Sequence, residues 1–193
     1  MSTRFIESSA SSSAVAAALL AVLFCGVLLA RRNKLKNTHH HADYNHEQTA
    51  STLWPSHTKR RHTTNAQGVK IATFTFEPTH AAKKPRGVVL LSPGLGVCCR
   101  HEWLTAKNEG HVHDKFDGSL IDALCRAGLL VHTYDHQGQG ESGCVRPGVR
   151  YYFERFDDLA RDLLQLHDEL RAEVGAELPL FWVGSSMGGG VAL

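Results

Sequence analysis

Strand-like and helix-like segments alternate from residue 68 onward, and this alternation constrains the fold more than any other feature of the sequence. Strands are predicted where β-branched, aliphatic or aromatic residues form short runs, at 70–76, 87–91, 129–134 and 180–183. The run at 87–91 is continuously apolar, which predicts a strand buried on both faces, and the run at 180–183 is predicted as a further buried strand. Helices are predicted where apolar residues recur every three or four positions, at 119–126, from about 153 to 174 and from 187 onward. Alternating strands and helices predict right-handed crossovers and a mostly parallel sheet, so the expected fold class is α/β.

The last predicted strand leads into Gly-Ser-Ser-Met-Gly, residues 184–188, where the sequence concentrates its chemistry. This stretch matches G-x-S-x-G, the nucleophile elbow, a tight strand-to-helix turn with strained backbone angles at the central serine. We therefore predict Ser186 as a nucleophile. Gly184 and Gly188 are the elbow glycines, because larger side chains there would collide where strand and helix meet. The alternative is an ordinary Gly/Ser turn between a strand and a helix.

A second glycine-rich turn, residues 92–96 (SPGLG), follows the 87–91 strand. Acyl transfer develops negative charge on the substrate carbonyl oxygen, and two fixed N–H donors stabilise that charge. We expect the backbone N–H groups of Leu95 and Met187 to form this oxyanion hole. A plain turn that closes a strand is the alternative.

A loop at 135–142 (DHQGQGES) follows the 129–134 strand, and we expect it to shape the site rather than react in it. Asp135 is predicted to brace the turn. A role as catalytic acid is the alternative, which its position at a strand end well before Ser186 disfavours.

Residues 14–30 form a run of 17 residues without a charge, the lower limit for a helix that crosses a bilayer. Four Lys/Arg residues follow at 31–36, whereas one arginine and one glutamate precede the run. The positive-inside rule then predicts a single-pass signal-anchor with the larger, C-terminal portion in the cytosol, on a membrane that the sequence does not identify. A cleaved signal peptide and a buried or transit-peptide segment are the alternatives.

Residues 31–67 contain seven Lys/Arg and six His and few aliphatic side chains, which predicts a tether. Contact with anionic lipid and metal binding by the histidine tract are alternatives to a solvated linker. The predicted organisation is thus an N-terminal tail at 1–13, an anchor at 14–30, a basic and His-rich linker at 31–67 and a folded part at 68–193.

Composition excludes several classes of protein. Lys and Arg total 21 against 19 Asp and Glu, so the formal charge of +2 lacks the basic excess of a nucleic-acid binder. Five cysteines, an odd number in a chain too long for a disulfide-stapled mini-protein, fit a reduced compartment. No metal site and no cofactor are predicted.

From about residue 69 to 193 the chain resembles the monoacylglycerol lipase-like branch of the α/β-hydrolases, which includes lysophospholipase-like and serine aminopeptidase-like sequences. The resemblance rests on segments in the family's order and approximate spacing, namely VVLLSPGLG, YDHQGQGESG, FDDLARDLLQLHDEL and LPLFWVGSSMGGG. It implies a membrane-associated esterase that acts on lipid-like acyl esters, with Ser186 as nucleophile. Three departures stand out: Pro93-Gly94 replaces the usual His-Gly, Ser185 replaces the usual His, and 97–115 does not follow the family pattern.

Seven residues follow Ser186, whereas the triad of this fold runs along the chain as Ser, then Asp or Glu, then His. The sequence therefore lacks the expected acid and base, and the upstream histidines at 132, 136 and 167 cannot simply replace the base. Two hypotheses follow: the chain is the N-terminal part of a longer serine hydrolase, or it is an inactive membrane-tethered protein with a binding role.

Overall fold

The computed structural model of the chain describes residues 54–55, 58–79, 84–106 and 113–193. The predicted tail at 1–13, the predicted anchor at 14–30 and most of the predicted linker lie outside the described residues. None of the helices in the described ranges has the length and apolar character of a membrane span.

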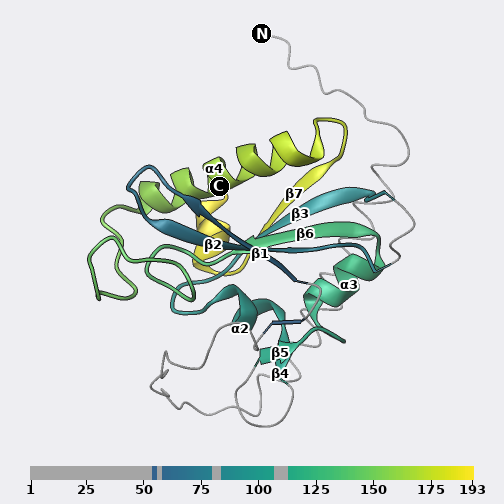
Figure 1. The fold of residues 1–193 in the computed structure, drawn as a ribbon, viewed down its shortest axis with the longest axis horizontal. Coiled ribbons are helices and arrows are strands. Elements are labelled where there is room, and N and C mark those ends of the chain that lie inside the picture. The colour runs from purple at the N-terminus through teal and green to yellow at the C-terminus, as the bar shows by residue number, and fades with distance from the viewer. Residues whose placement is uncertain (1–53, 56–57, 80–83, 107–112) are drawn as a thin grey trace. The chain divides into compact units, whose positions relative to one another are not determined.

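A five-stranded sheet lies at the centre of the described part, with its strands in the order β1-β2-β6-β3-β7 (Figure 1). The strands are β1 (Lys59–Thr64), β2 (Lys70–Phe76), β3 (Gly87–Ser92), β6 (Leu129–Tyr134) and β7 (Leu180–Gly184). β2 pairs antiparallel with both β1 and β6, whereas β3 pairs parallel with both β6 and β7. Four strands therefore run in one direction and β2 in the other, which confirms the mostly parallel sheet and all four predicted strands.

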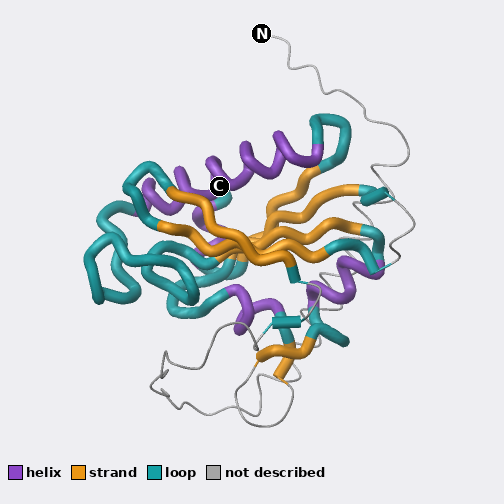
Figure 2. The backbone as a smooth tube through the Cα atoms, in the orientation of Figure 1, coloured by secondary structure: helices purple, strands orange, loops and turns teal. Residues whose placement is uncertain are grey.

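Helices lie on both sides of the sheet (Figures 1 and 2). On one side, α4 (Phe156–Val174) and α5 (Met187–Val191) pack against the sheet through a shared apolar core. On the other side lie α2 (Cys99–Trp103), α3 (Leu120–Arg126) and a small antiparallel pair of strands, β4 (Thr105–Ala106) and β5 (His113–Lys115). This layering is what the alternating sequence pattern predicts.

The core beneath α4 comes from side chains at regular spacing on the helix and the strands. On α4, the buried leucines at 159, 163, 166 and 170 follow the predicted three-to-four period. They meet Val88 and Leu90 of β3 and Leu130 and Tyr134 of β6, which alternate along their strands. The helix begins at Phe156 rather than 153, and Asp158 accepts a hydrogen bond from the Arg155 N–H at its N-terminus (3.2 Å).

α3 begins and ends where its sequence predicts. The Ser119 hydroxyl accepts a hydrogen bond from the Asp122 N–H (3.1 Å), an N-cap interaction. Gly128, just past the helix, has a φ of 84°, a left-handed conformation that favours glycine at this place. The short connection then enters β6 directly and places that strand beside β3.

The predicted linker at 31–67 is wrong at its C-terminal end, because β1 lies within it. β1 carries the sequence KRRHTT and forms the outer strand of the sheet. Its basic side chains form ion pairs, Lys59 with Glu77 (2.6 Å), Arg61 with Glu173 (3.3 Å) and Arg60 with Glu141. A charged edge strand resists pairing with other chains, which explains why this strand carries no apolar signal.

The prediction that the strand at 180–183 is buried is wrong. All β7 side chains are at least partly exposed, and Trp182 is 36% exposed. Within the described residues β7 pairs only with β3, so it is an edge strand of this sheet. By contrast, β3 is fully buried along its length, as predicted.

Candidate active site

Ser186 lies in the turn between β7 and α5, with backbone angles of φ 51° and ψ −120°. Positive φ is uncommon for a residue other than glycine and is strained, so the surrounding structure must impose it. The side chain is exposed at the end of the strand. This backbone geometry is the one expected of a nucleophile elbow, and the Ser186 side chain is open to solvent.

Close approach of three backbone segments forces this turn. A Cβ placed on Gly184 would lie 2.4 Å from the carbonyl carbon and oxygen of Gly188. A Cβ on Gly188 would lie 2.2 Å from the Ser92 oxygen and 2.5 Å from the Pro93 oxygen. Neither position has room for a side chain, because the neighbouring atoms are backbone.

The turn after β3 lies against the nucleophile turn. The Ser185 N–H donates to the Ser92 carbonyl (3.0 Å), and a Cβ on Gly94 would lie 3.4 Å from Ser186 Cβ. Within the described part of the chain, the N–H groups of Leu95 and Met187 donate to no protein acceptor. Both donors therefore stay available for an oxyanion, although their role there remains a prediction.

Asp135 braces the loop that follows β6, as the sequence indicates. The carboxylate is 1% exposed and accepts hydrogen bonds from the Cys99 N–H (2.7 Å) and the Glu141 N–H (2.8 Å). Burial raises the pKa of Asp135, and these two hydrogen bonds oppose that effect. Both carboxylate oxygens are thus engaged with backbone N–H groups.

None of the described histidines makes a hydrogen bond to the Ser186 hydroxyl. His132 Nδ1 contacts Thr75 Oγ1 (2.8 Å), and burial lowers the pKa of His132 to about 4. His167 lies on α4 beside Asp168 and Trp182. His136 Nε2 contacts the Pro93 carbonyl oxygen (3.0 Å). Each of these three rings thus contacts a group other than the Ser186 hydroxyl.

The sequence identified the 135–142 loop as site-shaping but missed two of its residues, His136 and Gln139. The His136 ring is fully buried against Tyr134. The Gln139 side-chain oxygen accepts a hydrogen bond from the Gly96 N–H (2.7 Å). The available signal was a run of polar residues at the carboxyl end of a buried strand, where sites of α/β folds lie.

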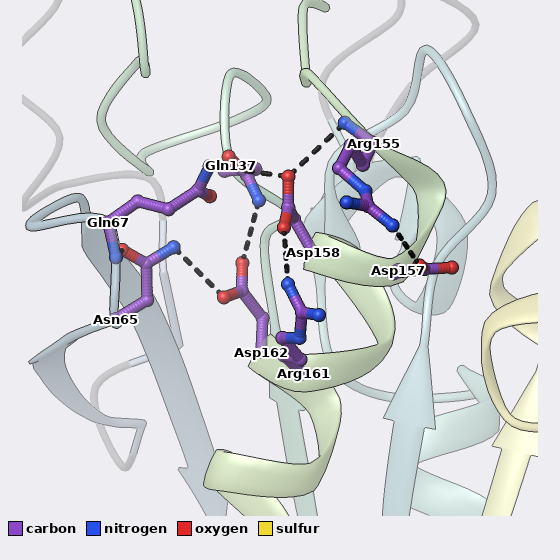
Figure 3. A network of polar contacts seen from close by, with 8 residues as sticks. All are labelled: Asn65, Gln67, Gln137, Arg155, Asp157, Asp158, Arg161 and Asp162. Carbon is purple, nitrogen blue, oxygen red and sulfur yellow. Dashed lines mark hydrogen bonds and ion pairs between the residues drawn. The ribbon is translucent and has the colours of Figure 1, made fainter.

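The same loop is also attached to α4 through a polar network (Figure 3). Gln137 Nε2 donates to Asp162 Oδ2 (3.1 Å), and Asn65 Nδ2 donates to Asp162 Oδ1 (2.9 Å). Asp158 accepts a hydrogen bond from Gln67 Nε2 (3.3 Å) one helical turn earlier. Burial raises the pKa of Asp162 to about 6.

The cysteines and the remaining titratable groups form no further centre in the described part. Cys98, Cys99, Cys125 and Cys144 form no disulfide there. Burial raises the pKa of Cys98, Cys99 and Cys125, that of Cys125 to about 12, which favours the unreactive thiol. Among the described residues, no group of three or more metal-ligating side chains is arranged to hold an ion.

Parts of this chain are similar in sequence to known proteins. A family model described as serine aminopeptidase, S33, matches residues 110–193. The monoglyceride lipase of Rattus norvegicus is 28% identical over 132 residues, which make up 68% of this chain and 36% of that protein. The monoacylglycerol lipase of Mycolicibacterium smegmatis is 32% identical over 130 residues, 64% of this chain and 36% of that protein. The chain thus spans about a third of the length of these relatives.

Solved structures show the same fold. A thermostable carboxyl esterase from Bacillus coagulans superposes with a TM-score of 0.53 at 22% identity, over 70% of this chain and 38% of the esterase. The expected α/β-hydrolase fold is therefore confirmed for the described part. The sequence matches show that this part of the chain is similar to the monoacylglycerol lipase-like branch of the α/β-hydrolases.

Proposed function

We propose that this chain supplies the nucleophile and the oxyanion donors of a serine ester hydrolase. The observation that carries the proposal is the strained backbone of Ser186 in a turn that Gly184 and Gly188 close sterically. Such strain persists only where the surrounding structure imposes it. The turn places the Ser186 hydroxyl outside the end of β7. The turn at Pro93–Gly96 lies beside it.

In the proposed reaction, Ser186 Oγ attacks the ester carbonyl carbon and its proton passes to a base. The carbonyl oxygen becomes an oxyanion that the N–H groups of Leu95 and Met187 stabilise, each such donor being worth roughly 10²- to 10³-fold in turnover. The base then returns this proton to the ester oxygen as the C–O bond breaks, so the alcohol leaves and the acyl group stays on Ser186. Water, which loses a proton to the same base, attacks the acyl carbon and frees both the acid and the serine hydroxyl. In this fold the acid partner and the base follow the serine along the chain.

The proposed substrates are lipid-like acyl esters, namely acylglycerols or lysophospholipids. Support comes from the relatives, which are named as monoglyceride or monoacylglycerol lipases.

The uncharged run at 14–30 and the basic residues after it support a second proposal, that a single-pass anchor holds the hydrolase portion at the cytosolic face of a membrane. A tag after Leu193 that is protected in the lumen, or release of the protein by a carbonate wash, would contradict this topology.

A non-catalytic role is the second candidate function. The observation that favours it is that none of the described histidines contacts the Ser186 hydroxyl, because a serine hydroxyl without a base is a weak nucleophile at neutral pH. In that case the chain is a membrane-tethered binding protein, and Ser186 does not react. The two candidates differ in a single measurable property, the reactivity of Ser186.

The test compares the 193-residue chain with a version extended by the downstream coding sequence. We expect the 193-residue chain to react with a fluorophosphonate probe near background, because loss of a triad base costs about 10⁴-fold in turnover. The extended version should react strongly and hydrolyse monoacylglycerol, and Ser186→Ala should abolish both. Ser185→Ala is the matched control, since the Ser185 contact with Ser92 is made by the backbone N–H, which alanine keeps.

Several results would overturn parts of this proposal. Undiminished labelling after Ser186→Ala would remove Ser186 as nucleophile. Absence of an in-frame continuation with the missing acid and base would favour the non-catalytic candidate. Robust Ser186-dependent turnover by the 193-residue chain would instead show that a base is recruited from within it or from a partner.

A further inference from the structure

The loop after β6 holds the turn after β3 at three successive points. His136 Nε2 donates to the Pro93 carbonyl (3.0 Å), Gln139 Oε1 accepts from the Gly96 N–H (2.7 Å), and Asp135 Oδ1 accepts from the Cys99 N–H (2.7 Å). All three side chains are at most 1% exposed. Side chains so deeply buried are held in one position, so these contacts fix the backbone they touch.

Two of these contacts lie on either side of the expected oxyanion donor. The His136 contact holds the peptide group between Pro93 and Gly94, because it engages the carbonyl of Pro93. The Gln139 contact holds the peptide group between Leu95 and Gly96, because it engages the N–H of Gly96. The peptide group between them carries the Leu95 N–H.

We propose that His136 and Gln139 are positioning residues that orient the Leu95 N–H toward Ser186 by clamping the peptide groups before and after it. The inference rests on the proposed function, because it assigns the clamp to the oxyanion hole of that reaction. Neither residue touches the substrate. Their effect reaches the reaction through the backbone of Gly94 and Leu95.

The turn needs such a clamp because of its composition. Gly94 and Gly96 flank Leu95, and Gly96 adopts a φ of 77°, so the backbone on both sides can rotate more freely than at other residues. Pro93 has a fixed φ but lacks a backbone N–H, so it cannot hold the turn by donating a hydrogen bond. An oxyanion hole works only if its donors are oriented before the charge develops.

The His136 ring is committed to this contact. The Pro93 carbonyl can only accept, so Nε2 carries the proton and His136 donates. Burial lowers the pKa of His136 to about 4, which keeps the ring neutral. Nδ1 has no hydrogen-bond partner in the described part of the chain, so the ring serves Pro93 rather than a wider network.

The first test measures the clamp without any need for catalysis. Hydrogen exchange of the Gly96 amide is followed by NMR in the 193-residue chain in detergent micelles. Gln139→Leu removes the acceptor at similar size, and the Gly96 amide should then exchange about tenfold faster. Gln137→Leu is the matched control: Gln137 is equally buried in the same loop but contacts Asp162 of α4. In Gln137→Leu the hydrogen-exchange rate of the Gly96 amide should stay unchanged.

The second test measures the effect on chemistry in the extended version. Loss of transition-state stabilisation lowers kcat and kcat/KM equally, so His136→Leu and Gln139→Leu should lower kcat about tenfold with KM nearly unchanged. His136→Gln keeps an N–H donor and Gln139→Glu keeps an acceptor, and both should restore much of kcat. If the loop only stabilised the fold, these variants would not lower kcat selectively while KM stays the same. Nor would His136→Gln and Gln139→Glu recover kcat.

The outcomes separate the two proposals. Unchanged Gly96 exchange in Gln139→Leu overturns the clamp, whatever the activity. An equal loss of kcat in Gln137→Leu overturns it as well, since that control leaves the turn untouched. No Ser186-dependent turnover in the extended version overturns the proposed function, while the exchange comparison still decides whether Gln139 holds the turn.

Discussion

The nucleophile turn and the loop after β6 lie at the same end of the sheet, yet they are shaped by opposite means. In the nucleophile turn, backbone meets backbone, and the absence of side chains at Gly184 and Gly188 permits the contact. In the 135–142 loop, buried polar side chains do the holding through hydrogen bonds to the backbone of a neighbouring turn. The difference predicts that added bulk destroys the first region, whereas loss of hydrogen-bonding groups impairs the second.

The largest effect is expected from Gly188→Ala. The added Cβ would lie 2.2 Å from the Ser92 oxygen, so α5 must move away from β3. The free energy of unfolding should fall by about 3 kcal/mol or more, as overpacking of a rigid site does. Gly189→Ala is the matched control on the same helix, since its Cβ meets nothing closer than 3.4 Å.

Urea denaturation of the two variants tests this steric account. Gly189→Ala should be neutral or stabilising by up to about 1 kcal/mol, because alanine favours helix. Equal stability of the two variants would contradict the claim that contact between β3 and α5 shapes the turn.

A smaller but still large effect is expected from Gly140→Ala in the loop. The new Cβ would lie 2.0 Å from Asp135 Oδ2, and Gly140 also has a positive φ of 49°. Gly148→Ala separates the two causes, because Gly148 has a φ of 76° and nothing within 4 Å. Gly148→Ala should cost about 1 kcal/mol of stability through backbone strain alone, and Gly140→Ala clearly more. Equal costs would show that the Asp135 contact is unimportant.

The attachment of the loop to α4 should depend on pH through Asp162. Its pKa is raised to about 6 in the folded protein from 3.8, so its contribution to stability is full below about pH 4 and is lost as the pH rises through 6. The contribution is about 3 kcal/mol at most. Asp162→Asn removes it, so the variant should gain stability relative to the native chain as the pH rises from 4 to 7.

Denaturation curves across this pH range decide the point. Asp157→Asn is the control, since Asp157 lies near the same end of α4 but faces solvent and pairs with Arg155. The difference in free energy of unfolding between Asp162→Asn and the native chain should therefore change with pH. A constant difference would contradict the claim that the buried Asp162 carboxyl makes stability depend on pH.

The smallest effect is expected away from both regions, at β1. Arg61 and Glu173 form an ion pair at 3.3 Å with both side chains exposed. Exposed pairs contribute about 0.5 kcal/mol or less, so Arg61→Ala should leave the denaturation midpoint almost unchanged. A loss above about 1 kcal/mol would show that the β1 edge stabilises the fold more than exposed pairs do.

The parts of the fold that sequence predicted are those with an apolar signature. The strands at 70–76 and 129–134 and the leucine face of α4 were predicted because burial imposes a period on the sequence. β1 was missed because an outer strand with the sequence KRRHTT has no apolar face to reveal it. The exposure of β7 was missed because an apolar run does not say how many neighbours the strand has.

The site divides in the same way. The turn around Ser186 was predictable, because glycines at fixed spacing record a steric requirement in the local sequence. The roles of His136 and Gln139 were not, because each contact joins residues 43 positions apart and depends on β6 lying beside β3. Local sequence carries no record of such a contact.

The central claim is that the Leu95 and Met187 N–H groups face an oxyanion formed at Ser186. The most direct measurement is a crystal structure of the extended version after reaction with a fluorophosphonate. We expect phosphorus bonded to Ser186 Oγ and one phosphonyl oxygen at about 2.7–3.1 Å from both the Leu95 and Met187 nitrogens. An adduct on another residue, or a phosphonyl oxygen directed away from these two N–H groups, would contradict the account.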